Sequence, residues 1–249
     1  MKGNKKKSNL RTSEPRKLLK ANSPFAVKEA YNAIRTNLLF TQQGEKCPVF
    51  VVTSPTANNG KTINSANMAI SFAQMGKRTL IIDSDMRNPS LHKLFSLNSK
   101  NGLSEILAGL TDNITVSKTD IENLSVITAG KIPPNPAELL ASPRMANLLK
   151  FVKEHYDCVF IDTPPVNLVT DATAFAESAT GYIIIVKNDY TKTPELKYAV
   201  KTLENLGADV LGFVMNDTNI EKKKYFGYYK NADRYSYYYS YGKYSYGKE

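Results

Sequence analysis

The sequence predicts an α/β protein built on a mostly parallel β-sheet that is flanked by helices. Two observations support this fold class. Short and almost continuously apolar runs recur along the chain, and stretches with helical spacing of apolar residues lie between them. Strands without polar alternation are typical of sheets covered on both faces, and strands that alternate with helices are typical of parallel crossovers. A chain of 249 residues is long enough for one large domain of this class.

The predicted elements follow from these two patterns. The predicted strands are Val49–Thr53, Thr79–Asp83, Leu124–Thr128, Cys158–Asp162, Gly181–Val186 and Val210–Asn216. The predicted helices are Pro24–Phe40, Lys61–Met75, Leu103–Leu107, Asn135–His155, Asp171–Ser178 and Pro194–Leu206. Pro24 suits the first turn of a helix, and Val27, Ile34 and Leu38 then recur at helical spacing.

The net charge of +10 is concentrated at the two ends of the chain. Residues 1–20 carry eight Lys or Arg and one Glu, and residues 221–249 carry seven basic and three acidic side chains. We therefore expect a flexible basic extension at 1–23, one domain at 24–220 and a disordered tail at 221–249. A basic terminus suits an anionic membrane surface, although it also simply aids solubility.

The cellular compartment is predicted from what the sequence lacks. No apolar run approaches the roughly 20 residues that span a bilayer, and the first residues do not resemble a signal peptide. We therefore predict a cytoplasmic protein that is recruited to the inner face of the membrane. Cys158 opens an apolar run and is expected to be a buried small hydrophobic residue.

A phosphate-binding loop is predicted at Gly60-Lys61-Thr62, between the strand at 49–53 and the helix at 61–75. This strand–loop–helix context is what confirms a P-loop, in which backbone N–H groups hold phosphate oxygens. The usual first glycine of the motif is replaced by Pro55, so an asparagine is expected to supply a left-handed backbone position. The residues predicted to bind the nucleotide are Asn58, Asn59, Gly60, Lys61, Thr62 and Ile63.

Three aspartates end two of the predicted strands. Asp83 and Asp85 follow the second strand, and Asp162 ends the fourth. Ligands of open α/β sheets bind at the carboxyl ends of strands, so we expect these carboxylates to converge on Lys61. Thr62, Asp85 and Asp162 are predicted to organise Mg²⁺, and Asp83 to be the general base, with Asp85 as the alternative.

Asn216, which ends the last predicted strand, is a candidate for contact with the adenine base of ATP. A simple turn at Asn216-Asp217 is an equally acceptable interpretation.

The last 29 residues hold ten of the fifteen tyrosines and no Val, Ile, Leu or Met. Such a segment buries too little apolar surface to offset the entropy of ordering, so we expect it to be mobile. A mobile tail places its phenol hydroxyls within reach of a nucleotide site, which predicts autophosphorylation between molecules. The candidate sites are Tyr225, Tyr228, Tyr229, Tyr235, Tyr237, Tyr238, Tyr239, Tyr241, Tyr244 and Tyr246.

With these motifs in place, residues 24–249 resemble the bacterial tyrosine kinases of capsule and exopolysaccharide systems. The resemblance rests on Gly60-Lys61-Thr62, Asp83-Ser84-Asp85-Met86-Arg87, Ile161-Asp162-Thr163-Pro164 and the tyrosine cluster. It implies a P-loop NTPase fold like that of MinD and ParA, ATP and Mg²⁺ as cofactors, and autophosphorylation that regulates polysaccharide synthesis. It also implies a membrane-embedded polysaccharide co-polymerase as activator and a cognate tyrosine phosphatase.

The same resemblance implies a ring-shaped homo-oligomer. The family assembles through a helix with the pattern ExxRxxR, and this chain matches it at Glu29 and Arg35 but carries Asn32 in place of the first arginine. Asparagine lacks the bidentate ion pair of arginine, which weakens the expected ring contact.

Three other functions fit parts of the sequence. A MinD/ParA-like regulatory ATPase shares the fold, but its signature lysine would fall at Thr56. A nucleic-acid-binding tail would stack bases on tyrosines, yet the domain between the basic ends is nearly neutral and the prediction is that no nucleic acid binds. A catalytically degenerate scaffold would explain Pro55 and Asn32, although every catalytic position is filled.

Overall fold

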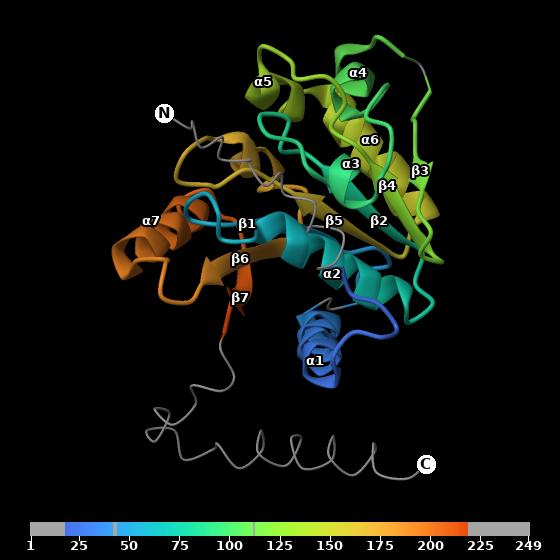
Figure 1. Cartoon of the computed structure of the whole chain (residues 1–249). Coiled ribbons are helices and arrows are strands. Elements are labelled where there is room, and N and C mark those ends of the chain that lie inside the picture. Colours follow the sequence, from blue (N-terminus) through green and yellow to red (C-terminus); the bar gives the residue numbers. More distant parts are fainter. Residues whose placement is uncertain (1–17, 42–43, 112, 219–249) are drawn as a thin grey trace, which may run out of the picture.

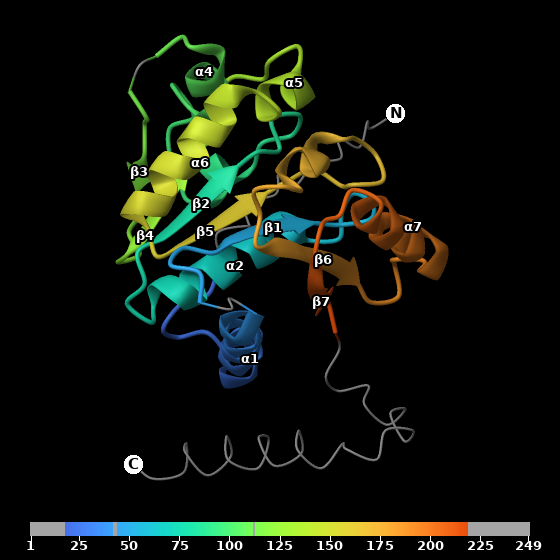
Figure 2. The same cartoon turned by 180° about the vertical axis from the view of Figure 1, so that it is seen from behind.

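The computed structural model describes residues 18–41, 44–111 and 113–218, and Figures 1 and 2 show the chain from opposite sides. The strands are β1 (Val49–Thr53), β2 (Thr79–Asp83), β3 (Ser117–Lys118), β4 (Leu124–Ile127), β5 (Cys158–Asp162), β6 (Gly181–Lys187) and β7 (Val210–Asn216). The helices are α1 (Phe25–Thr41), α2 (Lys61–Ala73), α3 (Leu91–Leu94), α4 (Leu103–Ala108), α5 (Pro136–Leu140), α6 (Pro143–His155), the 3-10 helix η2 (Asp171–Phe175) and α7 (Thr193–Glu204).

The described strands form one seven-stranded sheet in the order β3-β4-β2-β5-β1-β6-β7. Every neighbouring pair is parallel except β3 and β4, which are antiparallel. The carboxyl ends of the parallel strands therefore meet at one edge of the sheet, where β1 passes into the loop before α2. This arrangement confirms the predicted fold class.

Helices cover both faces of the sheet, and each face has its own apolar core. On one face α1, α2 and α3 pack against the sheet, and the Phe50 and Phe160 rings lie 5.2 Å apart between centroids. Most of α2 is buried, and its small side chains let it approach the strands closely.

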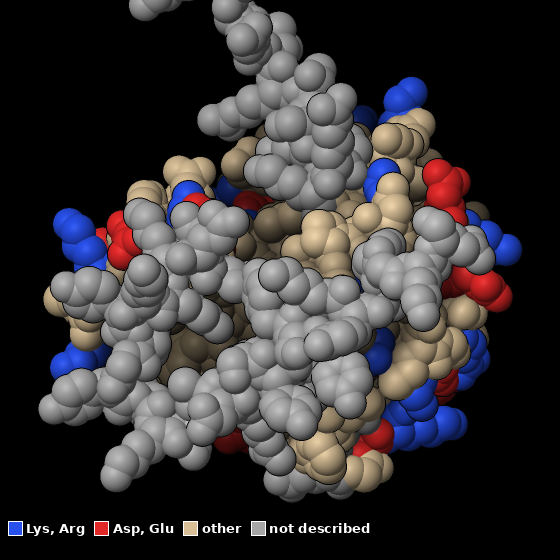
Figure 3. Space-filling model, turned by 60° about the horizontal axis from the view of Figure 1, so that its bottom comes forward, with Lys and Arg blue, Asp and Glu red and all other residues tan. Residues whose placement is uncertain are grey.

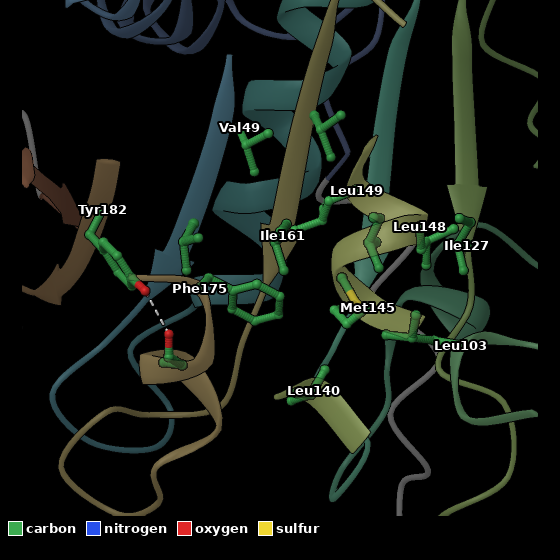
Figure 4. Close-up of a cluster of buried hydrophobic side chains, with 14 of the residues drawn as sticks. Val49, Leu103, Ile127, Leu140, Met145, Leu148, Leu149, Ile161, Phe175 and Tyr182 are labelled. Carbon is green, nitrogen blue, oxygen red and sulfur yellow. Dashed lines mark hydrogen bonds between the residues drawn. The ribbon is translucent and has the colours of Figure 1, made fainter. Parts of the chain in front are cut away.

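The opposite face is covered by α4, α5, α6, η2 and α7. Figure 4 shows Met145 and Leu148 of α6 beside Ile127, and Tyr182 of β6 donating a 2.7 Å hydrogen bond to the Ala172 carbonyl. Because both faces are buried, the central strands are apolar throughout.

Most predicted strands agree with the structure because each is a compact apolar run. Four of them keep their bounds, while β4 ends one residue earlier and β6 one residue later than predicted. The short elements β3 and α3, of two and four residues, were not predicted because they are too short to show a period.

The prediction of one helix over 135–155 was wrong, since α5 and α6 are separate helices on either side of Ala141-Ser142. Pro143 begins α6, and a proline has no N–H with which to continue the preceding helix. The predicted helix at 171–178 is the shorter 3-10 helix η2.

The packed domain begins before residue 24. Leu18 and Leu19 are buried against the core beside α2, and the Leu19 N–H donates to Asn67 Oδ1 at 2.8 Å. Residues 1–17 and 219–249, which include most of the predicted extension and the whole predicted tail, lie outside the described residues.

The face of the molecule seen in Figure 3 carries charges of both signs. In Figure 3 Lys and Arg side chains lie next to Asp and Glu side chains around the rim of the bottom face. None of the helices in the described ranges combines the length and the apolar character that crossing a membrane requires.

Candidate active site

The loop between β1 and α2 has the backbone of a phosphate-binding turn. Gly60 lies just before α2 in the left-handed conformation, with φ of 84°, and Asn58 has φ of 63°. Pro55 stands where a P-loop usually has a glycine, so another residue of the loop was expected to take the left-handed conformation. Asn58 takes it, and Asn59 does not. The first N–H groups of α2 have no partner within the helix and are free to face an anion, as at other helix N-termini.

Asn59 holds this loop from inside. Its side chain is fully buried, where Nδ2 donates to the Thr56 carbonyl at 2.7 Å and Oδ1 accepts from the Lys187 N–H at 3.2 Å and from the Thr191 hydroxyl. The amide of Asn59 is therefore occupied by protein groups that join the loop to the segment after β6. The Asn59 side chain therefore braces the loop, and the nucleotide contact expected for Asn59 stays a prediction.

Asn216, at the end of β7, reaches the same loop. Its Nδ2 donates to the Asn59 carbonyl at 2.9 Å, and a Cβ added at Gly60 would lie 2.2 Å from that Nδ2. The close approach of Asn216, together with the positive φ, explains why residue 60 is a glycine. The adenine contact expected for Asn216 stays a prediction.

The register of β2 and β5 places Asp83 beside Asp162, because the two are paired across the parallel strands. Asp85 lies beyond the end of β2, and its Oδ2 is 2.7 Å from Lys61 Nζ. The Lys61 ammonium also interacts with the Asp162 and Asp83 carboxylates. The structure thus brings together the lysine and all three aspartates that the sequence singled out.

Hydrogen bonds occupy these aspartates unequally. Asp83 Oδ2 accepts from the backbone N–H groups of Ser90 and Leu91 at 3.1 and 3.0 Å, whereas Asp83 Oδ1 has no hydrogen-bond partner among the described residues. Both carboxylate oxygens of Asp162 are buried and lack a partner at ordinary hydrogen-bond geometry in this part of the chain, although the Thr62 hydroxyl and the Lys61 ammonium favour the charged form of Asp162. Both oxygens of Asp85 are used, by Lys61 and by the Asn88 N–H at 3.0 Å.

Burial changes the acidity of this cluster. It raises the pKa of Asp83 to about 8, helped by the negative charge of Asp162, and it raises the pKa of Asp162 to about 6 against the opposing charge of Lys61. Burial alone lowers the pKa of Lys61, but the carboxylates of Asp162 and Asp85 outweigh it and raise that pKa. The lysine therefore stays charged, and burial brings the pKa of Asp83 and of Asp162 toward neutral pH.

The buried carboxylate of Asp162 fits a divalent cation, which would satisfy oxygens that lack a hydrogen-bond partner among the described residues. Within the described residues, no three His, Cys, Asp or Glu side chains form a cluster that would hold a metal by themselves. That combination suits Mg²⁺, which keeps several waters and takes one or two protein carboxylates together with phosphate oxygens. Thr62, whose hydroxyl is 3.5 Å from Lys61 Nζ, lies at the same place.

The partner of Arg87 was not predicted from the sequence. Its guanidinium makes two 2.9 Å hydrogen bonds to the two oxygens of Asp171, which is fully buried at the start of η2. This bidentate pair ties the segment after β2 to the segment after β5. Asp171 belongs to no motif of the sequence, so only the fold shows its role.

The residues predicted for subunit assembly have partners within the chain. Arg35 Nη1 donates to the Ser71 carbonyl at 2.7 Å and to its hydroxyl at 3.1 Å, while Asn32 Nδ2 donates to Glu29 Oε1 at 2.8 Å. Their role in assembly stays a prediction. The ten candidate tyrosines at 225–246 lie outside the described residues.

Comparisons with known proteins identify the family. The AAA domain family matches residues 56–211, more than half of the chain. The putative tyrosine-protein kinase CapB of Staphylococcus aureus is 38% identical over 208 residues, which are 83% of this chain and 91% of that protein. The chain belongs to the bacterial tyrosine kinase family. Its P-loop fold implies binding of a nucleotide together with a divalent metal.

Two solved kinase-family structures superpose on this chain. The chimerical protein CapA2B2 is 38% identical, with 78% of this chain and 85% of that one covered and a TM-score of 0.72. The kinase domain of the Escherichia coli tyrosine kinase ETK is 33% identical, with 80% and 81% covered and a TM-score of 0.73. The bacterial tyrosine kinases share their fold with MinD/ParA-like ATPases, and family membership favours the kinase interpretation.

Proposed function

We propose that this kinase-family chain transfers the γ-phosphoryl group of ATP to tyrosine hydroxyls, including those at 225–246. The observation that carries the proposal is the meeting of Lys61 with Asp83, Asp85 and Asp162 at the carboxyl edge of the sheet. A simple structural ion pair would not need three carboxylates, and it would not leave buried carboxylate oxygens unpartnered.

Lys61 is the phosphate-binding cation in this proposal. Its ammonium is paired with Asp85 Oδ2 at 2.7 Å. The β- and γ-phosphates of a bound nucleotide would compete with Asp85 for this ammonium. Asp85 Oδ2 would then be available to a divalent cation, while Asp85 Oδ1 keeps its hydrogen bond from the Asn88 N–H.

Thr62, Asp85 and Asp162 would hold Mg²⁺. When bound, this cation neutralises negative charge on the transferred phosphoryl group. Asp162 is the strongest of the three candidates, because both of its oxygens are buried and lack a partner at ordinary hydrogen-bond geometry among the described residues.

Asp83 is the proposed general base. Its Oδ2 is held by the N–H groups at the start of α3, while Oδ1 keeps a free lone pair. Oδ1 takes the proton of the tyrosine hydroxyl as the phenol oxygen bonds to the γ-phosphorus, and the bond from that phosphorus to the bridging oxygen breaks to release ADP. Asp85 is the alternative base, and the variants below separate the two.

The setting of this reaction is also proposed. The resemblance to capsule and exopolysaccharide kinases supports a regulatory role in polysaccharide synthesis, a ring-shaped homo-oligomer, a cognate phosphatase and a place at the inner face of the membrane. A solved relative carries the name CapA2B2 and is a chimerical protein. We propose that a CapA-like membrane protein activates this chain by ordering the nucleotide and the cation at the Lys61 loop.

The test is phosphoryl transfer from labelled ATP to the full chain, followed by phospho-amino-acid analysis and mapping of the modified residues. We expect phosphotyrosine in the wild type and none in Lys61→Met. Lys77→Met is the matched control, because Lys77 is exposed at the opposite edge of the sheet and should leave transfer unchanged. Label only on serine or threonine, or undiminished label in Lys61→Met, would refute the proposal.

A second measurement assigns the base. Asp83→Asn should keep Mg²⁺·ATP affinity and lose transfer by a factor of about 100 or more, in the usual range for general-base removal. Asp85→Asn with that profile instead would move the role of base to Asp85. Loss of metal binding in Asp83→Asn would make Asp83 a metal ligand.

A further inference from the structure

A chain of hydrogen bonds between side chains joins α1 to the nucleotide loop. The Tyr31 hydroxyl on α1 donates to Asn64 Oδ1 at 2.9 Å and accepts from Asn67 Nδ2 at 3.1 Å, both on α2. The two asparagines are only 3% exposed. The surrounding interface between the helices is apolar, with Ile34 and Leu38 packed against the core. A polar cluster at this place is costly unless every member is paired, so its geometry is tightly specified.

The Tyr31 hydroxyl is a dependable donor at neutral pH. Burial raises the pKa of Tyr31 above its ordinary value, although the hydrogen bond from Asn67 opposes this. The phenol therefore keeps its proton, and that proton is directed at Asn64.

Asn64 passes this constraint to the loop. Its Nδ2 donates to the Gly60 carbonyl at 2.9 Å, and the same carbonyl accepts from the Asn64 backbone N–H at 3.1 Å. The peptide group between Gly60 and Lys61 is planar and trans, so its C=O and N–H point in opposite directions. Fixing the Gly60 carbonyl toward α2 thus fixes the direction of the Lys61 N–H, the first free donor of the helix.

Glycine makes this constraint necessary. Gly60 has φ of 84°, and a residue without Cβ resists rotation of its peptide groups less than any other. Asn216 contacts the loop through the carbonyl of Asn59, one residue earlier, so it does not hold the Gly60–Lys61 peptide itself. Asn64 holds this peptide, because its side-chain and backbone N–H groups both donate to the Gly60 carbonyl.

We propose that Tyr31 is a positioning residue for nucleotide binding, which acts through Asn64 to orient the Gly60–Lys61 peptide toward the phosphates. The proposal rests on the proposed function only in taking this loop as the nucleotide site. It predicts that the Tyr31 hydroxyl changes the affinity for the nucleotide, although this hydroxyl lies on α1 and does not contact the nucleotide.

The experiment removes that hydroxyl alone. Tyr31→Phe keeps the ring and its packing, and should weaken Mg²⁺·ADP binding to the full chain about fivefold, measured by calorimetric titration. Tyr182→Phe is the matched control. Tyr182 is also buried, and its hydroxyl donates at 2.7 Å to the Ala172 carbonyl on the other face of the sheet. It should lose similar thermal stability without loss of affinity.

A double-mutant cycle tests the route. Asn64→Ala should weaken binding about tenfold, and adding Tyr31→Phe to it should change affinity by less than twofold, because the link is already broken. The cycle gives an answer even where one variant is less stable, since all titrations are run below the melting temperature of the weakest variant.

The outcomes are distinct. Unchanged affinity in Tyr31→Phe, or a loss equal to that of Tyr182→Phe, would overturn the positioning role and leave only a structural one. If the two substitutions Tyr31→Phe and Asn64→Ala change the free energy of binding additively in the double variant, Tyr31 does not act through Asn64 and the proposed route is overturned. A wild-type chain that binds no nucleotide would instead refute the proposed function.

Discussion

The two ends of β5 carry the same residue in opposite circumstances. Asp157, just before the strand, accepts hydrogen bonds from the backbone and the guanidinium of Arg78, both at 2.8 Å. Asp162, which ends the strand, lacks a partner at ordinary hydrogen-bond geometry for either oxygen among the described residues. The hydrogen bond from Arg78 lowers the pKa of Asp157, whereas burial raises that of Asp162 to about 6.

This contrast separates stability from function along a single strand. At the amino end the carboxylate is satisfied by the protein and belongs to the fold. At the carboxyl end the Asp162 carboxylate is buried, and its burial lowers the stability of the fold. Natural sequences retain such a destabilising group chiefly where a bound ligand completes the site. Isosteric Asp→Asn changes at the two positions therefore form a matched pair.

The largest expected effect is on catalysis. Asp162→Asn should reduce tyrosine phosphorylation by a factor of about 1000, because an amide is a poor ligand for a divalent cation and carries no charge. Asp157→Asn should leave the rate within twofold. Initial rates with labelled ATP at saturating Mg²⁺ measure both. Comparable losses in the two variants would end the distinction between the strand ends.

The next effect concerns Asp171, the buried partner of Arg87. Asp171→Ala should lower the free energy of unfolding by about 3 kcal/mol, since both hydrogen bonds from Arg87 to a fully buried carboxylate are lost. The Arg87 side chain is 44% accessible, so water can solvate the guanidinium once its partner is removed, and the loss should not exceed this value. Urea unfolding of the nucleotide-free protein is the measurement, with Thr173→Ala of the same helix as control.

A smaller effect runs in the opposite direction. Without nucleotide and metal, Asp162→Asn should raise the free energy of unfolding by about 1 kcal/mol, because it removes the desolvation cost of a fully buried carboxylate while Asp85 still pairs with Lys61. Adding Mg²⁺·ADP should stabilise the wild type and not the variant. If the metal-free variant is less stable than the wild type, the interpretation of Asp162 as an unsatisfied ligand group is wrong.

The smallest effect is the pH dependence of Asp157. Its pKa is lowered in the folded chain, so its contribution to stability is present above the ordinary value of about 3.9 and is lost as the pH falls through the lower folded value. Because the pair with Arg78 is partly exposed, we expect under 1 kcal/mol. The stability difference between wild type and Asp157→Asn should therefore shrink as the pH falls below the ordinary Asp pKa of about 3.9.

Much of the carboxyl edge could be predicted from the sequence. Parallel strands that each end in aspartate must bring those residues to one edge, so the meeting of Asp83 and Asp162 follows from pattern alone. The P-loop was predicted from its three-residue signature and its context. The missing glycine predicted a left-handed asparagine at Asn58 or Asn59, and the structure shows that it is Asn58.

The remaining contacts depend on tertiary packing, which leaves no local pattern. Asp171 meets Arg87 across 84 residues, and Asn59 meets Thr191 across 132. Tyr31 resembled any apolar position of an amphipathic helix until its neighbours on α2 were known. The separation of α5 from α6 was indicated by Pro143, but apolar residues on both sides concealed it.

The end of β7 has a consequence for the reach of the tyrosines at 225–246. Since Asn216 contacts the nucleotide loop, the chain leaves Thr218 close to that loop. Tyr225 is then tethered by at most about 25 Å of extended chain, and Tyr246 by about 95 Å. For transfer between molecules, as proposed above, each tyrosine has to cover the distance from its own anchor at Thr218 to the nucleotide loop of a neighbour. The number of residues after Thr218 sets the upper limit of that reach, so the reach grows from Tyr225 to Tyr246.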